Sequence, residues 1–150
     1  VSEAIGRRIE VVSGGASTSL PLVAKETMPK EITQLRIGDA LYISDLDDCF
    51  DYKVFSDDDE AFTLQAEIIE LKGIRRRALL AVGRQDLGDC LHLRPLDPNI
   101  EVIGGSSDHT ILDITESEHC YKIGDIVSFH VMYENLLMLS QSEYVEKEYI

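Results

Sequence analysis

The second part of the sequence is a succession of short segments in which apolar and polar residues alternate. Alternation with a period of two directs successive side chains to opposite faces of a strand, and Gly or Pro between such segments ends each strand at a turn. Several short strands joined by turns are typical of a β-sandwich or a β-barrel. The segments are FTLQAEIIEL (62–71), IRRRALLAV (74–82), EVIG (101–104), TILDIT (110–115) and IVSFHVM (126–132), and Gly88, Pro95, Pro98, Gly104, Gly105 and Gly124 punctuate them.

The first part of the sequence has a different pattern, in which helical and strand segments alternate. We expect short helices over about 2–8 and 19–27, an apolar pair at 11–12 and a strand over about 34–43. Strands separated by helices pair in parallel, and two such strands do not form a stable sheet without further strands. The first part is therefore predicted to be a piece of a larger α/β structure, and a start without Met or a helix cap indicates a fragment.

An acidic run separates the two parts. Residues 44–60 carry eight carboxylates and one Lys, a composition typical of a solvated connector. We therefore divide the chain into an α/β piece at 1–45, a connector at 46–60 and a β domain at 61–150, and the fold class that we expect is mainly β. A basic cluster follows the run in the sequence and is predicted to lie near the rim of a pocket: Arg75, Arg76, Arg77, Arg84 and Arg94.

Charge and hydropathy exclude several classes of partner. The chain has 150 residues and a formal net charge of -14, which repels the nucleic-acid backbone and anionic lipid surfaces, because both are bound through Lys and Arg. No apolar run reaches the roughly 18 residues of a membrane-spanning helix, and no signal-peptide layout is present. Cys49, Cys90 and Cys120 cannot all pair, which favours a reducing compartment. We expect a cytoplasmic protein without nucleic-acid or membrane partners.

A Gly- and Ser-rich loop at 13–19 follows the apolar pair and opens a helix. Such a loop lets the backbone approach a ligand closely, and a helix N-terminus offers unpaired N–H groups to an anion. A turn with a Ser or Thr cap explains the same residues, since the loop has no P-loop Lys and no full dinucleotide spacing. Arg36 and Gly38 lie at the end of the next strand, and in parallel α/β barrels the loops after the last two strands often hold phosphate. Together the two segments predict a phosphate site, although Arg36 alone is typical of a surface ion pair.

Two Gly-containing segments end strands in the second part, at 83–86 and 104–109. Each is explained as a hairpin turn. Each also brings charged side chains, Arg84 in the first segment and Asp108 and His109 in the second, to what would be the rim of a pocket. His109 is a candidate acid or base, because imidazole titrates near neutral pH.

Other catalytic arrangements are not indicated. The neighbours His119 and Cys120 would face opposite ways on a strand, and no second pair of ligands has zinc-type spacing, so we expect no metal site. The GxSxG turn of Ser hydrolases does not occur around Ser13, Ser17 or Ser19.

Six segments of the chain, taken in order, resemble the pyridoxal-phosphate-dependent alanine racemase superfamily, and in particular its ornithine racemase branch. The resemblance covers nearly the whole chain. Members have an N-terminal (β/α)8 barrel and a C-terminal β domain and act as homodimers, so the resemblance implies that 1–45 is the last stretch of the barrel and 61–150 the β domain. The segments are VVSGGASTSLPL, MPKEITQLRIGDALY, IRRRALLAVGRQD, IEVIGGSSDHTILDIT, YKIGDIVSFHV and SEYVEKEY.

The resemblance also implies a set of residues that bind pyridoxal phosphate. Ser17 matches the phosphate-binding Ser after the penultimate barrel strand, and Gly38 and Asp39 match the backbone donors after the last strand. Arg36 matches the Arg that faces the pyridine nitrogen of the cofactor. An Arg stays protonated, so it discourages protonation of that nitrogen and weakens the ring as an electron sink. No Lys matches the Schiff-base Lys near the start of the barrel, so we expect the chain alone to be inactive.

Residues implied to lie near the amino-acid substrate depart from the pattern of alanine racemases. Arg84 stands where those enzymes have a Tyr as second base, and an Arg does not deprotonate. Ser107 replaces the Met of a Met-Asp pair near the substrate carboxylate. We therefore expect Arg84 and Ser107 to bind a substrate other than alanine, and Asp108 and His109 are the candidate catalytic residues. This branch also carries a Gly-rich insertion of roughly twenty residues, in the range of functional loops, which the chain lacks after Lys72.

Two other functions stay open on the sequence. If no barrel precedes the chain, it is a stand-alone β-rich binding or dimerisation module with an α/β extension. If the same type of site releases CO2 instead of exchanging the α-proton of an amino acid, the parent protein is a related pyridoxal-phosphate-dependent decarboxylase. An assay that follows both chirality and CO2 separates the racemase from the decarboxylase.

Overall fold

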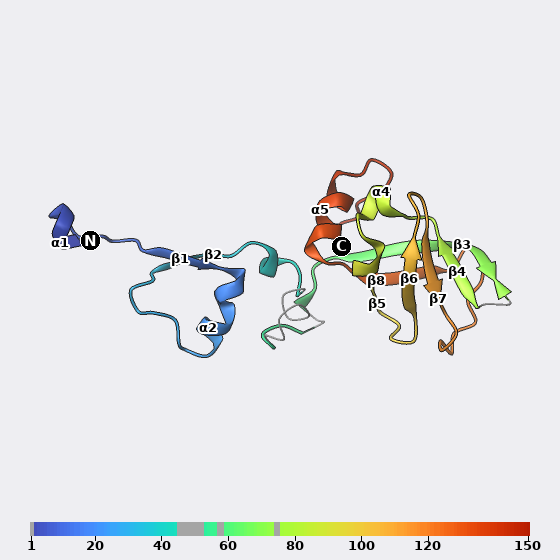
Figure 1. The fold of residues 1–150 in the computed structure, drawn as a ribbon, viewed down its shortest axis with the longest axis horizontal. Coiled ribbons are helices and arrows are strands. Elements are labelled where there is room, and N and C mark those ends of the chain that lie inside the picture. The colour runs from blue at the N-terminus through green and yellow to red at the C-terminus, as the bar shows by residue number, and fades with distance from the viewer. Residues whose placement is uncertain (1, 45–52, 57–58, 74–75) are drawn as a thin grey trace. The chain divides into compact units, whose positions relative to one another are not determined.

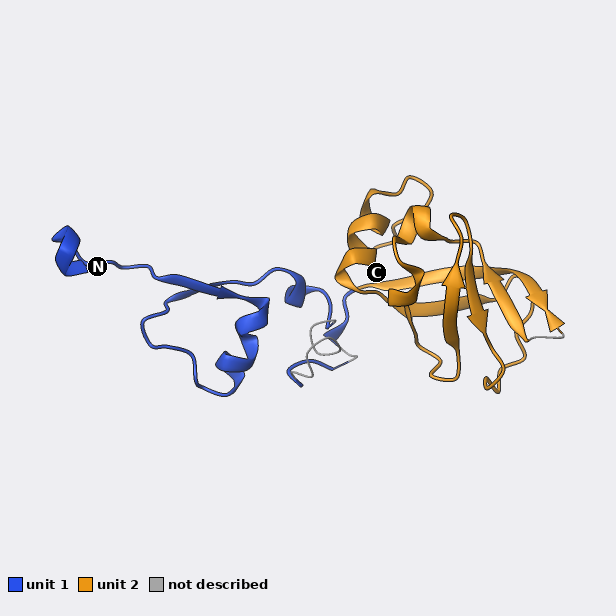
Figure 2. Ribbon diagram, viewed as in Figure 1, with its two compact units in different colours: residues 1–61 blue, residues 62–150 orange. Residues whose placement is uncertain are grey.

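The connector expected between the two parts of the chain is only partly described. The computed structural model describes four stretches of the chain, and most of the acidic run at 46–60, together with Cys49, lies outside them. The chain forms two compact units, residues 1–61 and 62–150, and each is described by itself (Figure 2). The described stretches are residues 2–44, 53–56, 59–73 and 76–150.

The first unit contains a two-stranded parallel sheet, as the alternation of helices and strands predicts, but its first strand lies within the predicted loop at 13–19 and not at the apolar pair 11–12. Strand β1 (Ser13–Ala16) pairs with strand β2 (Gln34–Arg36), with Ala16 opposite Arg36. A 3-10 segment and a helix connect the two strands, so the ends of both strands lie at the same edge of the sheet. The helical segments of this unit are α1 (Ser2–Ile5), η1 (Ser17–Ser19), α2 (Leu20–Ala24) and η2 (Asp39–Leu41).

The predicted strand at 34–43 is too long. Strand β2 ends at Arg36, and the chain then turns because the N–H groups of Gly38 and Ala40 donate to the Ser17 hydroxyl oxygen instead of to a neighbouring strand. The helix predicted at 19–27 is also shorter in the structure.

Few side chains are buried in the first unit. A two-stranded sheet is only marginally stable in water, because it has too little surface to cover its apolar residues. Many of its apolar side chains are exposed. They are Ile5, Ile9, Val11, Leu22, Val23, Leu41 and Tyr42.

The second unit is a six-stranded antiparallel sheet that curls into a nearly closed barrel (Figure 1). The strand order is β5-β8-β3-β4-β7-β6, and every pairing is antiparallel. The mainly β fold class predicted from the alternation is confirmed. The strands are β3 (Thr63–Lys72), β4 (Arg77–Leu80), β5 (Arg94–Pro95), β6 (Glu101–Gly105), β7 (Thr110–Asp113) and β8 (Ile126–His130).

The core of the second unit follows the period of two. In β3, Leu64, Ala66 and Ile68 are buried and the residues between them are exposed. Val127 and Phe129 of β8 pair directly with residues of β3 and face the same interior. Burial of one such aliphatic or aromatic side chain contributes roughly 1.5–3 kcal/mol, so the barrel interior is the main source of stability in this unit.

Two helices of the second unit differ from the sequence prediction. Helix α4 (Arg84–Leu87) forms where 83–86 was predicted to be a hairpin turn, and helix α5 (Tyr133–Gln141) follows β8. The two helices pack against each other. A 3-10 segment, η5 (Cys90–His92), follows α4. One helical turn contains too few residues to show a hydrophobic period, which explains why the sequence did not reveal α4.

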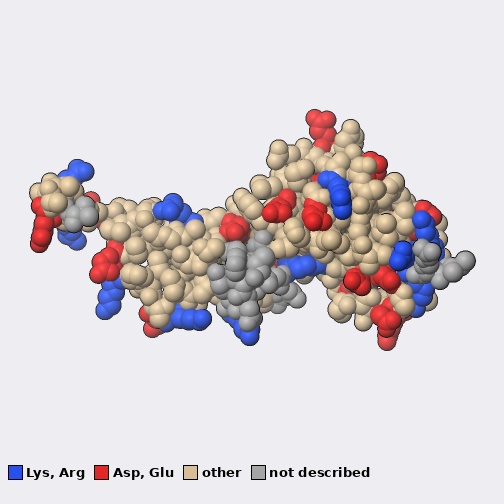
Figure 3. Space-filling view, viewed as in Figure 1, with Lys and Arg blue, Asp and Glu red and all other residues tan. Residues whose placement is uncertain are grey.

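Charged side chains of both signs are interspersed on the face of the second unit that Figure 3 shows. The described members of the basic cluster predicted near a pocket rim do not all lie at one end of a strand. Arg76 and Arg77 lie at the start of β4, and Arg84 follows the opposite end of that strand. Arg75 lies outside the described residues. Within the described part of the chain, no helix is long and apolar enough to cross a membrane.

Candidate functional site

The Ser17 hydroxyl lies at the centre of the predicted phosphate site. Its side chain is 4% exposed, and its oxygen accepts the N–H groups of Gly38 at 3.2 Å and of Ala40 at 3.4 Å. Ser17 follows β1 and Gly38 follows β2, so parallel pairing brings the two strand ends together. With both N–H groups donating to its oxygen, the hydroxyl has its own proton available for an anion.

Asp39 contributes a backbone donor to the same place. Its carboxylate accepts the N–H of Ala40 at 2.8 Å, and its own N–H finds no acceptor among the described residues. An unpaired N–H beside a hydroxyl that can donate fits a phosphate oxygen. The residues predicted to hold the phosphate, Ser17, Gly38 and Asp39, are therefore brought together by the structure.

Arg36 is held across the two-stranded sheet. Its guanidinium donates to the Ser13 hydroxyl oxygen at 2.7 Å, although both side chains are exposed. Because Ser13 begins β1 and Arg36 ends β2, this bond links the two strands and limits the directions that the guanidinium can take. The charge stays available, since a hydroxyl does not neutralise it.

A second cluster forms in the second unit, where the backbone of α4 lies along the turn between β6 and β7. The N–H of Arg84 donates to the carbonyl oxygen of Ser106 at 2.9 Å, and the N–H of Gln85 donates to that of Ser107 at 3.0 Å. The structure therefore brings together the two segments whose charged residues were predicted to lie at one rim. Arg84, Ser107, Asp108 and His109 all belong to these segments.

The turn between β6 and β7 orders the side chains of the cluster. The Ser106 N–H donates to the His109 carbonyl oxygen at 2.8 Å, and the His109 N–H donates to the Ser106 hydroxyl at 3.2 Å. The Ser107 hydroxyl donates to the Asp108 carboxylate at 2.9 Å. Asp108 is exposed and retains acceptor capacity for a further donor, so this carboxylate can bind an ammonium group or accept a proton.

A polar network lies elsewhere in the second unit, around Asp97. Its carboxylate accepts the Ser117 hydroxyl at 2.6 Å and the Tyr121 hydroxyl at 3.4 Å. The Ser117 hydrogen bond, followed by the backbone N–H of Asn99, holds the pKa of Asp97 below its usual value. Burial raises the pKa of Tyr121. The network ties the segment after β7 to the segment after β5, and its bonds are those of a structural link.

Cysteine and histidine residues do not form a metal site within the described part of the chain. No group of three or more His, Cys, Asp or Glu side chains there is placed to hold an ion. Cys90 is buried and Cys120 is exposed, and both are free thiols.

Comparison with known proteins relates these features to amino-acid racemases. The chain is 35% identical to ornithine racemase of Acetoanaerobium sticklandii over 164 residues, covering 93% of this chain and 46% of that enzyme. It is 34% identical to lysine racemase of Thermotoga maritima over 169 residues, covering 96% of this chain and 47% of that enzyme. Over the matched region the chain is homologous to ornithine and lysine racemases. No family model matches it.

The match covers only part of each racemase. The chain spans somewhat less than half of the length of the two curated relatives. Each match also runs over more residues than this chain contains, so both racemases carry additional residues within the matched region.

Several solved structures share the fold at low sequence identity. D-Threonine aldolase from Filomicrobium marinum has a TM-score of 0.69 at 15% identity, over 95% of this chain and 38% of that one. D-threo-3-Hydroxyaspartate dehydratase from Delftia sp. HT23 has a TM-score of 0.67 at 16% identity, over 92% of this chain and 40% of that one. An alanine racemase-like protein from Idiomarina loihiensis has a TM-score of 0.68 at 12% identity, over 92% of this chain and 40% of that one.

The sequence prediction missed the residues that hold α4 to the C-terminal segment. Asp86, Asn135 and Ser142 are buried or partly buried and hydrogen-bond between α4 and the C-terminal segment. Asp86 belongs to the VGRQD segment and Ser142 to the SEYVEKEY segment, which were both recognised as superfamily motifs. A contact between motifs so far apart in the sequence leaves no signal in local spacing.

Proposed function

We propose that the chain is the C-terminal portion of a cytoplasmic, homodimeric, pyridoxal-phosphate-dependent racemase that interconverts L- and D-amino acids. The observation that carries the proposal is the match to two amino-acid racemases over nearly the whole of this chain. Both of those enzymes are named for diamino acids, which supports a substrate with a long, polar side chain. In this proposal residues 1–45 complete a (β/α)8 barrel and residues 61–150 form the β domain, which helps to complete the active site of the partner subunit.

The residues of the first unit would hold the cofactor. When bound, pyridoxal phosphate supplies an electron sink for the carbanion that forms when the α-proton of an amino acid leaves. The Ser17 hydroxyl and the free N–H of Asp39, with Gly38 beside them, would bind its phosphate. Arg36, tethered by Ser13, would face its pyridine nitrogen and keep that nitrogen unprotonated. A weaker electron sink favours return of the proton over side reactions.

The residues of the second unit would act on the substrate. Arg84 carries a permanent positive charge and suits a carboxylate, and Ser107 offers a hydroxyl beside it. Asp108 or His109 would accept or return the α-proton on one face of the substrate, while the Lys expected in the preceding part of the barrel serves the other face. A chain of residues 1–150 would therefore have no racemase activity of its own.

An assay of the complete protein tests this proposal. The protein that contains this chain is incubated with ornithine, lysine, serine and alanine in turn, and both enantiomeric composition and CO2 are followed. We expect racemisation of a diamino acid without release of CO2. Release of CO2 would assign a decarboxylase instead, and a protein that begins near residue 1 and changes none of the four amino acids would be a stand-alone binding module.

A further inference from the structure

Helix α5 is hydrogen-bonded through its Asn135 side chain to the backbone that ends α4. Asn135 is fully buried, and its amide nitrogen donates to the carbonyl oxygens of Leu87 at 2.8 Å and Asp89 at 2.9 Å. Its amide oxygen accepts the N–H of Met132 at 3.3 Å. A buried amide that uses both of its N–H groups on one loop fixes that loop relative to its own helix, because an unpaired buried carbonyl is costly.

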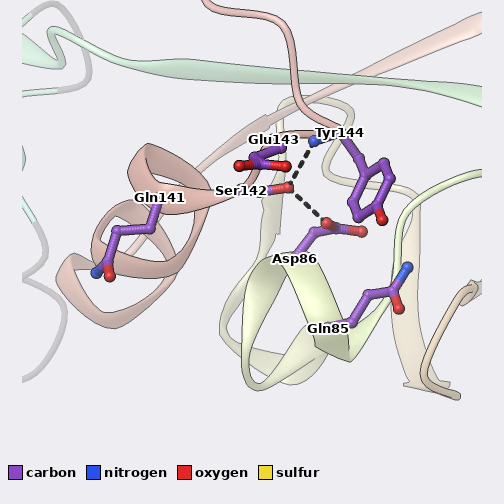
Figure 4. A pocket seen from close by; sticks show the side chains of 6 residues that line it. All are labelled: Gln85, Asp86, Gln141, Ser142, Glu143 and Tyr144. Atoms are coloured by element: carbon purple, nitrogen blue, oxygen red, sulfur yellow. Dashed lines mark hydrogen bonds between the residues drawn. The ribbon is translucent and has the colours of Figure 1, made fainter.

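The residues that follow α5 also bond to α4. The Ser142 hydroxyl donates to the Asp86 carboxylate at 2.7 Å, and the Tyr144 N–H donates to the Ser142 oxygen at 3.1 Å (Figure 4). Asp86 is only 6% exposed, and no Lys, Arg or His side chain in the described part of the chain pairs with it. The Ser142 hydroxyl is therefore the side-chain donor that this buried carboxylate depends on.

Helix α4 has little stability of its own. It is four residues long, and no side chain caps its N-terminus. One helical turn is below the length at which a helix is stable in isolation, so its geometry depends on contacts from outside. Those contacts come from two directions: the turn between β6 and β7 bonds to the N–H groups of Arg84 and Gln85, and the α5 segment bonds to Asp86 and Leu87.

We propose that Asp86, Asn135 and Ser142 are positioning residues for Arg84. They fix the backbone of α4 and so set the direction in which the Arg84 side chain leaves that helix. This proposal rests on the proposed function for its effect on a substrate, but the positioning itself is a property of residues 62–150. The residues from 133 to 144 are thus a functional part of the site although none of them is proposed to touch the substrate.

Ser142→Ala is the most informative variant, and Ser140→Ala is its matched control. Ser140 lies two residues earlier and donates its hydroxyl to the Leu137 carbonyl of its own helix. Amide hydrogen exchange is measured residue by residue on the 150-residue chain. In Ser142→Ala we expect the Leu87 and Gly88 amides, which close α4, to exchange about fivefold faster, the change that loss of one hydrogen bond produces. The amides of β3 should be unchanged, and Ser142→Thr should restore protection.

Two results of the exchange experiment would overturn the proposal. The first is equal exchange of the α4 amides in Ser142→Ala and Ser140→Ala. The second is a uniform loss of protection that includes β3, because that would be global destabilisation and not local positioning.

Kinetics of the complete racemase then test the link to the substrate. Displacement of Arg84 weakens binding, so we expect Ser142→Ala to raise the KM for the amino acid several-fold with kcat within about twofold, and Ser142→Thr to return KM to the wild-type value. A variant that merely folds less well would lose kcat at unchanged KM, and that result would contradict a positioning role. If the wild-type protein racemises no amino acid, the proposed function fails, while the exchange experiment still decides whether α5 holds α4.

Discussion

Gly83 lies directly against the backbone of His109. A Cβ atom at Gly83 would stand 2.4 Å from the His109 nitrogen, and 2.5 Å from the Ser107 carbonyl oxygen. Real Cβ atoms do not approach backbone atoms so closely, so only Gly allows α4 to lie along the turn between β6 and β7. This contact brings Arg84 into the same cluster as Asp108 and His109.

Gly83→Ala should therefore separate the two segments. The added methyl group meets backbone on both sides and cannot be accommodated by a side-chain rotation, so we expect a loss of about 1–3 kcal/mol in the free energy of unfolding. Gly73→Ala is the control, because a Cβ there has no neighbour within 4 Å among the described residues. Urea unfolding of the three proteins gives the comparison, and equal stability of Gly83→Ala and the wild type would refute the close contact.

Ser17→Ala should weaken the proposed phosphate site. The variant removes a hydroxyl donor and leaves the N–H group of Gly38 without its acceptor, while the Ala40 N–H keeps its bond to the Asp39 carboxylate. A hydrogen bond to a charged group contributes roughly 1.5–3 kcal/mol, so the Kd of the complete protein for pyridoxal phosphate should rise roughly 10- to 100-fold. Thr18→Ala changes the adjacent, exposed hydroxyl and should leave the Kd unchanged. A Kd that responds equally to both variants would argue against a phosphate role for Ser17.

Ser117→Ala should make the second unit more sensitive to acid. The pKa of Asp97 is lowered below 3.8, first by the Ser117 hydroxyl and then by the Asn99 N–H. A carboxyl group whose pKa is lowered by folding stabilises the folded state above its unfolded pKa, and this contribution is lost as the pH falls through the folded pKa. Without the Ser117 hydroxyl, the pKa returns toward 3.8 and acid unfolding begins at higher pH. Circular dichroism between pH 5 and pH 2 follows the shift, with Ser140→Ala as a control that should not move it.

The barrel strands are the part of the fold that the sequence predicts best. Leu64, Ala66 and Ile68 alternate with polar residues, and a period of two is enough to place them inside. The end of β2 at Arg36 was not predictable, because the turn that follows depends on Ser17, which lies far from Gly38 in the sequence. Local patterns do not report such contacts.

The candidate site was also predictable only in part. Parallel pairing of β1 and β2 was predictable from the helix-strand alternation, and it brings Ser17 to Gly38. In contrast, the hydrogen bond between Asp86 and Ser142 was not predictable, because the two residues lie far apart in the sequence. The resemblance named Arg84 and Ser107 as parts of one site, but the hydrogen bonds between their backbones are visible only in the structure.

The most direct test of the central claim is exchange of the α-proton of ornithine or lysine in D2O by the complete protein. If the chain belongs to a racemase, either enantiomer will incorporate deuterium at the α-carbon, lose its optical rotation and end as an equal mixture of L- and D-forms. Residues 1–150 alone will produce none of these three changes. Deuterium incorporation with release of CO2, or an unchanged enantiomer in the presence of pyridoxal phosphate, would contradict the assignment.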